Sequence, residues 1–244
     1  MKHNKQTYNN LSYSGTDLLF RGEEDLFRYN RWIVNKIVAH SKFDNSFKVL
    51  DYGAGIGTLA LIFKSLFSIT PDCIEIDPRQ IKILINRGFV TYPNLRSVKR
   101  KYDLIYSSNV LEHIENDVEI LKSLRSYLKE EGRLVLYLPA CQSIWSSMDI
   151  RVGHFRRYEK NMLKSKLIES GFSIEHVKYC DSIGYFLSYI FRFFGNDKGE
   201  PSSLSLKIYD FVILPISMGL DFFTSSFFGK NIFIVATANS RIKK

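Results

Sequence analysis

The stretch VLDYGAGIGTL, residues 49–59, decides the fold. It joins an apolar run, typical of a buried strand, to the start of an amphipathic run, typical of a helix. Gly53, Gly55 and Gly57 lie in the turn between them. Glycines at such a turn let the chain bend sharply and bring backbone N–H groups close to a ligand, because no Cβ stands in the way. The stretch therefore predicts a strand–turn–helix unit that binds a small molecule.

The spacing of an acidic residue narrows the kind of ligand. Asp51 stands two residues before Gly53, so the turn reads DxGxGxG, whereas dinucleotide-binding turns read GxGxxG. A carboxylate here would repel a pyrophosphate but would attract a cationic sulfonium compound. A second acid, Glu75, ends the next apolar run, DCIEID, where nucleotide-binding α/β folds hold ribose hydroxyls. The pair of acids favours a positively charged nucleoside.

The rest of the chain alternates between strand and helix patterns. We expect a first helix over residues 23–40 and further helices over 116–132, ending at Gly132 as C-cap, and over 159–170. Expected strands are residues 47–52, 72–77, 88–92 (weak), 102–108, 132–140, 172–180 and 231–239. Such alternation predicts parallel strands joined by right-handed crossovers. The predicted fold class is α/β, with a doubly wound, seven-stranded, mostly parallel sheet.

Composition restricts the partners and the compartment. Lys and Arg number 34 against 25 Asp and Glu, a net charge of +9 that favours anionic partners. The basic residues are spread along the chain without a nucleic-acid motif, so we expect no nucleic-acid partner; a merely solvated basic surface is the alternative. Cys73, Cys141 and Cys180 are isolated in apolar surroundings, and the first ten residues lack an apolar signal core. A reducing cytoplasm is therefore the expected compartment.

These motifs resemble those of class I S-adenosylmethionine-dependent methyltransferases, from about Trp32 to Asn239. The DxGxGxG turn is similar to their motif I, and YDLIYSSNVLEH, residues 102–113, to the segment that lines the methionine end of the cofactor. The resemblance implies cofactor contacts from Asp51, Gly53, Gly55, Gly57, Glu75, Ile76, Ser107 and Asn109. An acid that many relatives carry after the third strand is missing, so we expect residues 92–95 to contact the adenine through apolar and backbone groups.

Polar residues that could face the methyl acceptor cluster after the fifth strand. Methyl transfer to a hydroxyl needs alignment and removal of a proton, and His154 is the candidate base because a neutral imidazole accepts a proton near physiological pH. We expect substrate contacts from Trp145, Asp149, Arg156, Arg157 and Tyr158, with the arginines gripping phosphate or carboxylate. The alternative is that Asp149 forms a structural ion pair with an arginine while His154 caps the next helix.

The same segment, MDIRVGHFRRY (148–158), is similar to methyltransferases found with, or fused to, dolichol-phosphate-mannose-synthase-like glycosyltransferases. This resemblance implies an acceptor hydroxyl on a glycan, a lipid-linked saccharide or another small molecule. Two alternatives stay open. One is a non-catalytic cofactor-binding partner of a glycosyltransferase, and the other is a nicotinamide-dependent oxidoreductase, against which the position of Asp51 argues.

A metal site is not predicted. Glu112 and His113 resemble part of the ExxEH run with which ubiquinone-type and small-RNA O-methyltransferases, using a later His as well, hold a divalent metal. Asn109 replaces the first Glu of that run, which removes an anionic oxygen ligand. We expect Glu112 and His113 to begin the next helix instead, with the carboxylate near its N-terminus.

The chain is expected to be one domain over 1–244, with additions around the sheet of residues 45–181 and 230–240. Residues 1–44 would form a helical lid, and the aromatic segment 182–229 would form a helical insertion beside the acceptor. Its apolar runs are interrupted at Arg192, Asp210, Pro215 and Asp221, so no membrane-spanning helix is expected. Packing over the sheet or a dimer face is one interpretation, and peripheral contact with the inner membrane face is the other.

Overall fold

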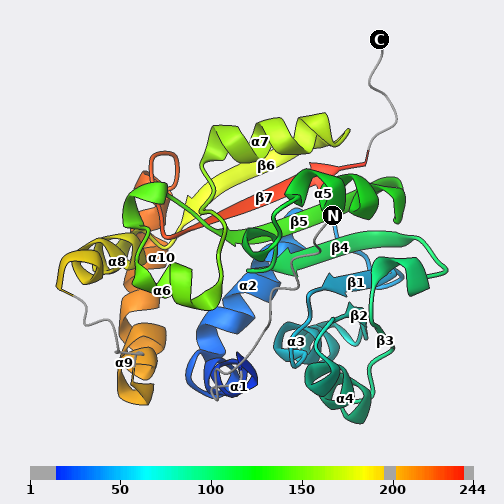
Figure 1. Cartoon of the computed structure of the whole chain (residues 1–244), viewed down its shortest axis with the longest axis horizontal. Helices are drawn as coiled ribbons and strands as arrows, with labels where there is room; N and C mark the ends of the chain where they lie inside the picture. Colours follow the sequence, from blue (N-terminus) through cyan, green and yellow to red (C-terminus); the bar gives the residue numbers. More distant parts are fainter. Residues whose placement is uncertain (1–14, 195–201, 239–244) are drawn as a thin grey trace, which may run out of the picture.

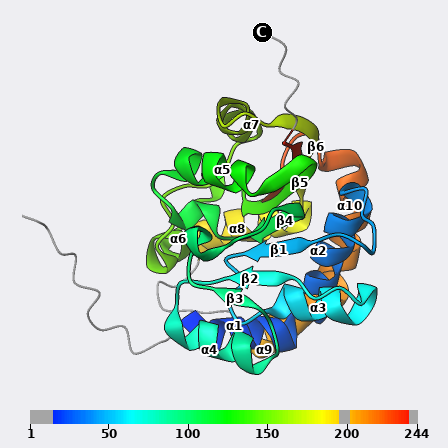
Figure 2. The ribbon, with the colours of Figure 1, turned by 90° about the vertical axis from the view of Figure 1, so that its right-hand side faces the viewer.

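The computed structural model describes residues 15–194 and 202–238 and contains a seven-stranded sheet in the order β3-β2-β1-β4-β5-β7-β6. Neighbouring strands from β3 to β5 are parallel, while β7 runs antiparallel to both β5 and β6. Figure 2 shows the strands stacked from β3 to β6. The strands are β1 (Val49–Tyr52), β2 (Asp72–Ile74), β3 (Thr91–Tyr92), β4 (Tyr102–Ser108), β5 (Leu128–Pro139), β6 (Ser173–Cys180) and β7 (Asn231–Thr237). The predicted doubly wound α/β fold is confirmed.

Helices cover both faces of the sheet (Figure 1). α2 and α3 pack on one face with Val49 and Leu104, whereas α5 and α7 pack on the other with Leu50 and Ile105. The α-helices are α1 (Gly15–Asp25), α2 (Phe27–His40), α3 (Thr58–Phe67), α4 (Pro78–Asn86), α5 (Asp117–Ser126), α6 (Ser147–Val152), α7 (Lys160–Glu169), α8 (Ser182–Phe194), α9 (Ser203–Ile208) and α10 (Leu214–Thr224). Short turns of other helix types are η1 (Leu95–Ser97), η2 (Leu111–His113), η3 (Gln142–Ile144) and the π-turn η4 (Tyr209–Ile213). Residues of β1 alternate between the two cores, as strand geometry requires.

The predicted helix over residues 23–40 is wrong at its start, because two helices, α1 and α2, meet at Leu26. The carboxylate of Asp210 accepts hydrogen bonds from the backbone N–H groups of Arg28 and Tyr29, at 2.9 and 2.7 Å. These N–H groups belong to the first turn of α2 and have no partner within the helix. A cap from the distant η4 segment therefore fixes the start of α2, and Phe27, the first residue of this helix, is 56% exposed.

The helix predicted over residues 116–132 exists, but its predicted end and C-cap at Gly132 are wrong. α5 ends at Ser126, and Gly132 lies within the long strand β5. A Cβ at Gly132 would lie 2.9 Å from the carbonyl oxygen of Lys129 and 3.1 Å from that of Tyr102. Its role is therefore to let β5 approach β4 closely at a register shift, and not to cap a helix.

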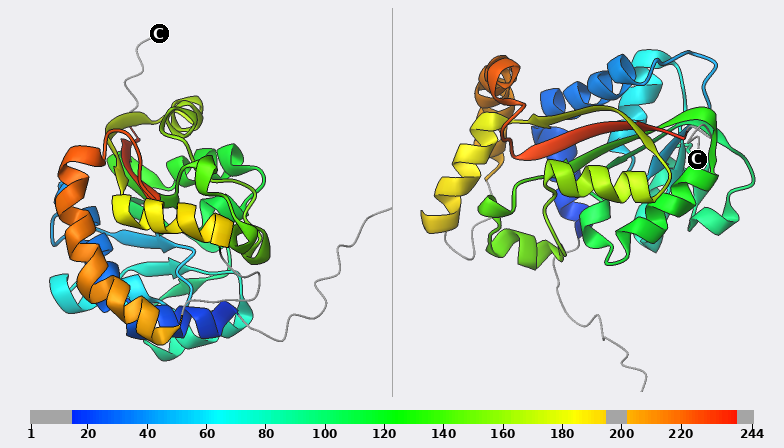
Figure 3. Two further views of the ribbon diagram at one scale, coloured as in Figure 1. Left: turned by 90° about the vertical axis from the view of Figure 1, so that its left-hand side faces the viewer. Right: turned by 90° about the horizontal axis from the view of Figure 1, so that it is seen from above.

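The segment between β6 and β7 forms α8 and a continuous helical rod of α9, η4 and α10, drawn in yellow and orange in Figure 3. By length and composition only, this rod, Ser203–Thr224, is long and apolar enough to cross a membrane, contrary to the expectation from the sequence. Only 17% of its 18-residue apolar window is buried. The carboxylate of Asp221 accepts hydrogen bonds from the backbone of Asp181 and Ser182, so both aspartates of the rod tie it to the protein.

Candidate active site

A cavity of about 560 Å³ opens at the carboxyl edge of the sheet, between the β1–α3 turn, the end of β2 and the residues after β4. Ligands bind at this edge in open α/β sheets, and the volume lies within the range of small-molecule sites. The wall opposite the sheet is formed by α1 and α2. Residues from those helices that line the cavity are Leu18, Leu19, Gly22, Glu23, Leu26, Tyr29, Asn30 and Ile33.

Asp51 lies at the end of β1 and lines this cavity although only 3% of the residue is exposed. One carboxylate oxygen accepts a hydrogen bond of 2.8 Å from the hydroxyl of Tyr106 on β4. Burial raises the pKa of Asp51 to about 7; the Tyr106 hydrogen bond opposes this effect and the negative charge of Glu75 adds to it. Burial thus disfavours the ionised form of Asp51, and a cation bound nearby would stabilise that form.

Glu75 fastens the glycine turn to the end of β2. Its two carboxylate oxygens accept hydrogen bonds from the backbone N–H groups of Gly55 at 2.8 Å, Ile76 at 2.7 Å and Asp77 at 3.0 Å. A carboxylate oxygen has room for more than one donor, so these bonds leave capacity for hydroxyls from a ligand. The side chain therefore positions the glycine turn and keeps acceptor capacity at the cavity.

Gly53 and Gly55 both adopt positive φ, at 77° and 57°. A Cβ at Gly53 would lie 2.4 Å from a methyl carbon of Val110, and one at Gly55 would lie 3.1 Å from Leu19. The backbone conformation and the crowding both require glycine here. Gly57 begins α3, and a Cβ there would lie 2.7 Å from Leu84, so this glycine serves helix packing and does not line the cavity.

After β4, the chain places Asn109 at the cavity and Ser107 away from it. Asn109 is exposed in a left-handed conformation at φ 53°, which asparagine tolerates better than most residues. Ser107 is 1% exposed, and its hydroxyl donates a 2.7 Å hydrogen bond to the carbonyl oxygen of Tyr52. The expected cofactor contact from the Ser107 side chain is thus wrong; neighbouring Ser108 lines the cavity instead, as does Ile76, which is 80% exposed.

The predicted lid over residues 1–44 includes α1, but the sequence analysis did not single out the α1 residues that line the cavity. Glu23 anchors α1 to the rest of the protein through a bidentate ion pair with Arg87, at 2.7 and 2.9 Å, and by accepting a 2.7 Å hydrogen bond from the hydroxyl of Thr58. Residues 92–95, expected near the adenine, do not line the cavity. A sequence signal existed in the apolar residues Leu18, Leu19 and Phe20, but no capping motif marked the helix.

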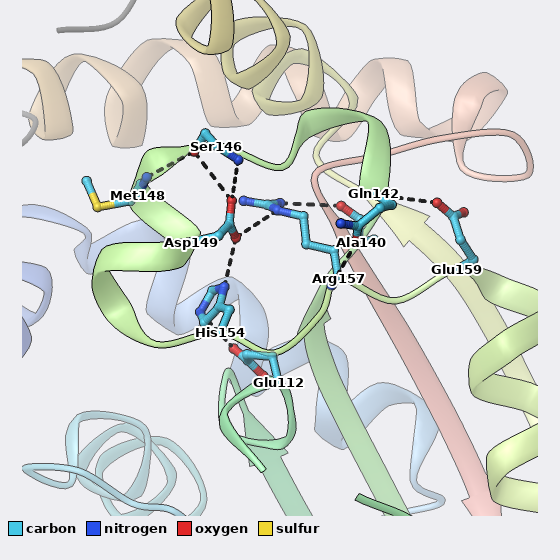
Figure 4. A network of polar contacts seen from close by, with 9 residues as sticks. All are labelled: Glu112, Ala140, Gln142, Ser146, Met148, Asp149, His154, Arg157 and Glu159. Carbon is cyan, nitrogen blue, oxygen red and sulfur yellow. Dashed lines mark hydrogen bonds and ion pairs between the residues drawn. The ribbon is translucent and has the colours of Figure 1, made fainter. Parts of the chain in front are cut away.

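The acceptor-side segment folds into a polar network around Asp149, which is 1% exposed (Figure 4). One oxygen of Asp149 lies 2.8 Å from Nδ1 of His154 and accepts a 2.9 Å hydrogen bond from Nε of Arg157. Burial raises the pKa of Asp149, but the hydrogen bond with His154 and the charge of Arg157 outweigh it, so the pKa lies below its ordinary value. The alternative of a structural Asp149–Arg157 ion pair is therefore the arrangement in the structure.

Tyr158 and Arg156 were expected to touch substrate, and the structure corrects both expectations. Tyr158 is completely buried, and its hydroxyl donates to Asp117 at 2.9 Å. Arg156 pairs with the same carboxylate at 3.0 Å and donates to the carbonyl oxygens of Ile114 and Glu115. Both side chains fasten the start of α5 to the sheet. Trp145 is half-buried at the end of η3 and stays a candidate substrate contact.

Glu112 and His113 lie in the 3-10 turn η2 and do not begin α5, which starts at Asp117. His113 lines the cofactor cavity, and its ring lies 4.6 Å from that of His154. Glu112 is completely buried, and neither carboxylate oxygen has a hydrogen-bond partner among the described residues. Burial raises the pKa of Glu112 to about 8. Burial, and then the proximity of His154, lowers the pKa of His113.

A family model described as a methyltransferase domain matches residues 23–177, more than half of the chain and the whole of the cavity-forming part of the sheet. The chain belongs to the methyltransferase domain family. The cofactor of this methyltransferase is S-adenosylmethionine, and its acceptor is a small molecule. Methyl transfer therefore replaces the hydride-transfer and non-catalytic alternatives.

Solved structures agree with the fold of the methyltransferase. A putative sarcosine dimethylglycine methyltransferase from Galdieria sulphuraria shares 17% identity, with a TM-score of 0.59, over 87% of this chain and 86% of that chain. An S-adenosylmethionine-dependent methyltransferase from Archaeoglobus fulgidus shares 19% identity, with a TM-score of 0.58, over 90% and 99%. Coclaurine N-methyltransferase, bound to N-methylheliamine and S-adenosylhomocysteine, shares 12% identity, with a TM-score of 0.57, over 85% and 72%. No curated protein sequence matches the chain.

The cavity of the methyltransferase suits its cofactor. Asp51 offers a negative charge to the cationic end, and Glu75 offers acceptors to the ribose. Close approach to the turn is possible because a Cβ is missing at Gly53 and Gly55. The apolar residues of α1 and α2 supply a wall for the flat base. These assignments to individual residues are proposals that rest on this fit.

Replacing Asp51 by Asn is expected to stabilise the methyltransferase above pH 7 while weakening cofactor binding. The raised pKa, about 7, means that between about pH 4 and pH 7 the folded protein holds a proton that the unfolded chain loses. The free energy of unfolding of the wild type therefore falls as pH rises through this window, whereas that of the Asn variant does not fall for this reason. Thermal unfolding at pH 5 and pH 8 measures the difference: the Tm of the variant should exceed that of the wild type by more at pH 8 than at pH 5. An advantage that does not change with pH contradicts the pKa assigned to Asp51.

Proposed function

We propose that this methyltransferase transfers the methyl group to a hydroxyl of a lipid-linked saccharide while it lies against the inner face of a membrane. The observation that carries the proposal is an apolar face formed by α8 and the α9–α10 rod, at the edge of the sheet where the cavity opens. We define the apolar face by its exposed residues Phe186, Leu187, Tyr189, Ile190, Leu204, Ile208, Phe211, Val212, Ile216, Met218, Leu220, Phe222 and Phe223.

The size and charge of this face favour a lipid surface. Phe222 and Phe223 are 84% and 74% exposed, which is unusual for neighbouring aromatic residues in a protein surrounded by water. Two basic residues lie nearer the start of the rod: Arg28 is 4.3 Å from the ring of Phe211, and Lys207 is exposed in α9. An apolar helix face beside basic residues is the pattern of proteins that lie in the headgroup region of an anionic membrane.

The resemblance of residues 148–158 to methyltransferases that accompany glycosyltransferases supports a saccharide as the part of the acceptor that is methylated. α8 contacts η3, which precedes this segment in the chain: Arg192 donates to the carbonyl oxygen of Ser143, and the hydroxyl of Tyr185 lies 3.1 Å from the hydroxyl of Ser143. A lipid bound along the apolar face would thus lead toward the segment where the acceptor is expected.

We infer the roles of the two additions to the sheet from these contacts. The described part of the proposed lid, α1 and α2, covers the cofactor cavity, while residues 1–14 lie outside the described residues. α9 contacts α1 through Asp25, whose carboxylate accepts a 2.9 Å hydrogen bond from Ser203 and lies 3.5 Å from Lys207. Movement of α1 during cofactor exchange would therefore break or shift the contacts that Asp25 makes with the membrane-facing rod.

Membrane contact is tested by flotation with vesicles that contain phosphatidylglycerol. We expect wild-type protein to float at low salt, and the Phe222→Ser/Phe223→Ser variant to lose most of that binding because it removes two exposed apolar rings. Ile168→Ser in α7, a site that is 57% exposed and outside the apolar face, is the matched control and should float like wild type. Wild-type protein that stays with the soluble fraction at low salt refutes membrane contact.

The acceptor is tested with cofactor labelled at its methyl group. Label should enter a polyprenyl-phosphate-linked saccharide faster than the same saccharide without lipid. Activity only on the free saccharide, or only on an unrelated small molecule, contradicts the lipid-linked acceptor.

A further inference from the structure

The side chains of Glu112, His113 and His154 meet next to the cofactor cavity. One ligand-type atom from each, a carboxylate oxygen and two imidazole nitrogens, lies within 4.8 Å of the others. They come from two segments, η2 and the loop after α6, which are joined by a 2.8 Å hydrogen bond from the backbone N–H of Phe155 to the carbonyl oxygen of Glu112. The arrangement is therefore anchored by the backbone as well as by side chains.

Asp149 fixes which nitrogen of His154 faces the cluster. Its oxygen Oδ1 accepts a hydrogen bond from Arg157 and also lies 2.8 Å from Nδ1 of His154, so Nδ1 must carry the proton that is shared with this acceptor. In a neutral imidazole the proton is then absent from Nε2. Nε2 therefore presents a lone pair, and it lies 3.7 Å from Oε1 of Glu112.

Nε2 of His154 and Oε1 of Glu112 thus face each other in a buried place, at a distance too long for a hydrogen bond. Neither carboxyl oxygen of Glu112 has a hydrogen-bond partner among the described residues, although the side chain is completely buried. A buried polar group without a partner is strongly disfavoured. A cation between Glu112 and His154, with His113 as third ligand, satisfies all three groups at once.

We propose that Glu112, His113 and His154 hold a divalent transition-metal ion at the border of the cofactor cavity. Two imidazoles and a carboxylate suit ions such as Zn²⁺ or Mn²⁺, and bonds of about 2.1 Å would draw the three side chains slightly together. The Asp149–His154 hydrogen bond is the contact that orients histidine ligands in metal sites. Because His113 lines the cavity, an ion held by these residues would border it.

Binding of the ion does not depend on the proposed function. Only its role in catalysis rests on that proposal. A cation held here would lower the pKa of an acceptor hydroxyl bound beside it, and the proton would pass to solvent. The acceptor oxygen would form its bond to the methyl carbon as the carbon–sulfur bond breaks, which leaves the neutral thioether. His154 acts in this arrangement as a ligand, whereas the sequence pattern predicted a base.

Metal binding is measured without cofactor or acceptor, so its outcome is separate from that of the acceptor test. Chelator-treated full-length protein is titrated with Mn²⁺, free Mn²⁺ is followed by electron paramagnetic resonance, and Zn²⁺ is then added as competitor. We expect one Mn²⁺ per chain, displaced by Zn²⁺. Glu112→Gln, which keeps the shape of the side chain, should weaken binding by about tenfold or more.

Two further variants make the test decisive. His113→Ala alters an exposed side chain and should bind Mn²⁺ equally poorly while keeping the wild-type Tm. His176→Ala removes one ring of a separate histidine pair, His40 and His176, whose rings lie 4.5 Å apart, and should bind like wild type. Wild-type protein that binds neither ion overturns the proposal, as does unchanged affinity in both Glu112→Gln and His113→Ala. A loss of binding in His176→Ala overturns it as well.

Discussion

Gly55→Arg should abolish binding of S-adenosylmethionine. The glycine has a φ of 57°, and a Cβ would already lie 3.1 Å from Leu19 of α1, so a long side chain must enter the cavity or displace the lid. A positive charge there would also repel the cationic cofactor beside Asp51. Isothermal titration calorimetry should show affinity reduced by about 100-fold or more, equivalent to about 2.7 kcal/mol.

The matched control for this variant is Gly219→Arg in α10, where a Cβ meets no atom within 4 Å. Gly219 is not among the residues that line the cavity, so cofactor affinity should stay as in wild type. Circular dichroism and Tm show whether both variants fold. A folded Gly55→Arg protein with wild-type affinity would contradict the assigned cofactor site.

Glu75→Gln should weaken cofactor binding by about 10- to 100-fold, since hydrogen bonds to a charged group contribute roughly 1.5–3 kcal/mol. The change keeps an oxygen for the backbone N–H groups of the turn but removes the negative charge and one acceptor. We expect a larger loss for compounds with an intact ribose than for analogues that lack its 2′-hydroxyl. Calorimetry with both kinds of ligand measures the difference.

Asp72→Asn is the control for Glu75. Asp72 begins β2, the strand that Glu75 follows, but its carboxylate accepts a 2.7 Å hydrogen bond from Tyr102 and pairs with Arg100, away from the cofactor cavity. Its replacement should leave cofactor affinity unchanged even where stability falls. Equal losses in both variants would mean that the fold of β2, and not the Glu75 carboxylate, is what the cofactor requires.

The features that could be predicted from the sequence are those with local patterns. Asp51 and Glu75 each lie at the end of an apolar run, and the glycine turn directly follows the run that contains Asp51. The carboxyl edge of β1 and β2 could therefore be located from this spacing alone. The alternation of strand and helix gave the doubly wound sheet for the same reason. Each of these signals lies within a few residues of the element that it marks.

The features that could not be predicted depend on contacts between distant segments. The start of α2 is set by Asp210, which is 182 residues from Arg28. Arg156, Arg157 and Tyr158 looked free for a substrate, yet Asp117 and Asp149 hold them in the fold. A sequence shows which residues are charged, but pairing is decided by tertiary packing. For the same reason, the sequence could not show that the Glu112 carboxyl group is buried without a hydrogen-bond partner among the described residues.

The most direct test of the cofactor site is a crystal structure with S-adenosylhomocysteine. We expect the thioether product in the cavity under α1, with ribose hydroxyls within hydrogen-bonding distance of Glu75 and the backbone of Gly55 against the ligand. Product bound elsewhere on the protein, or a cavity that stays closed to it at saturating concentration, would contradict the account.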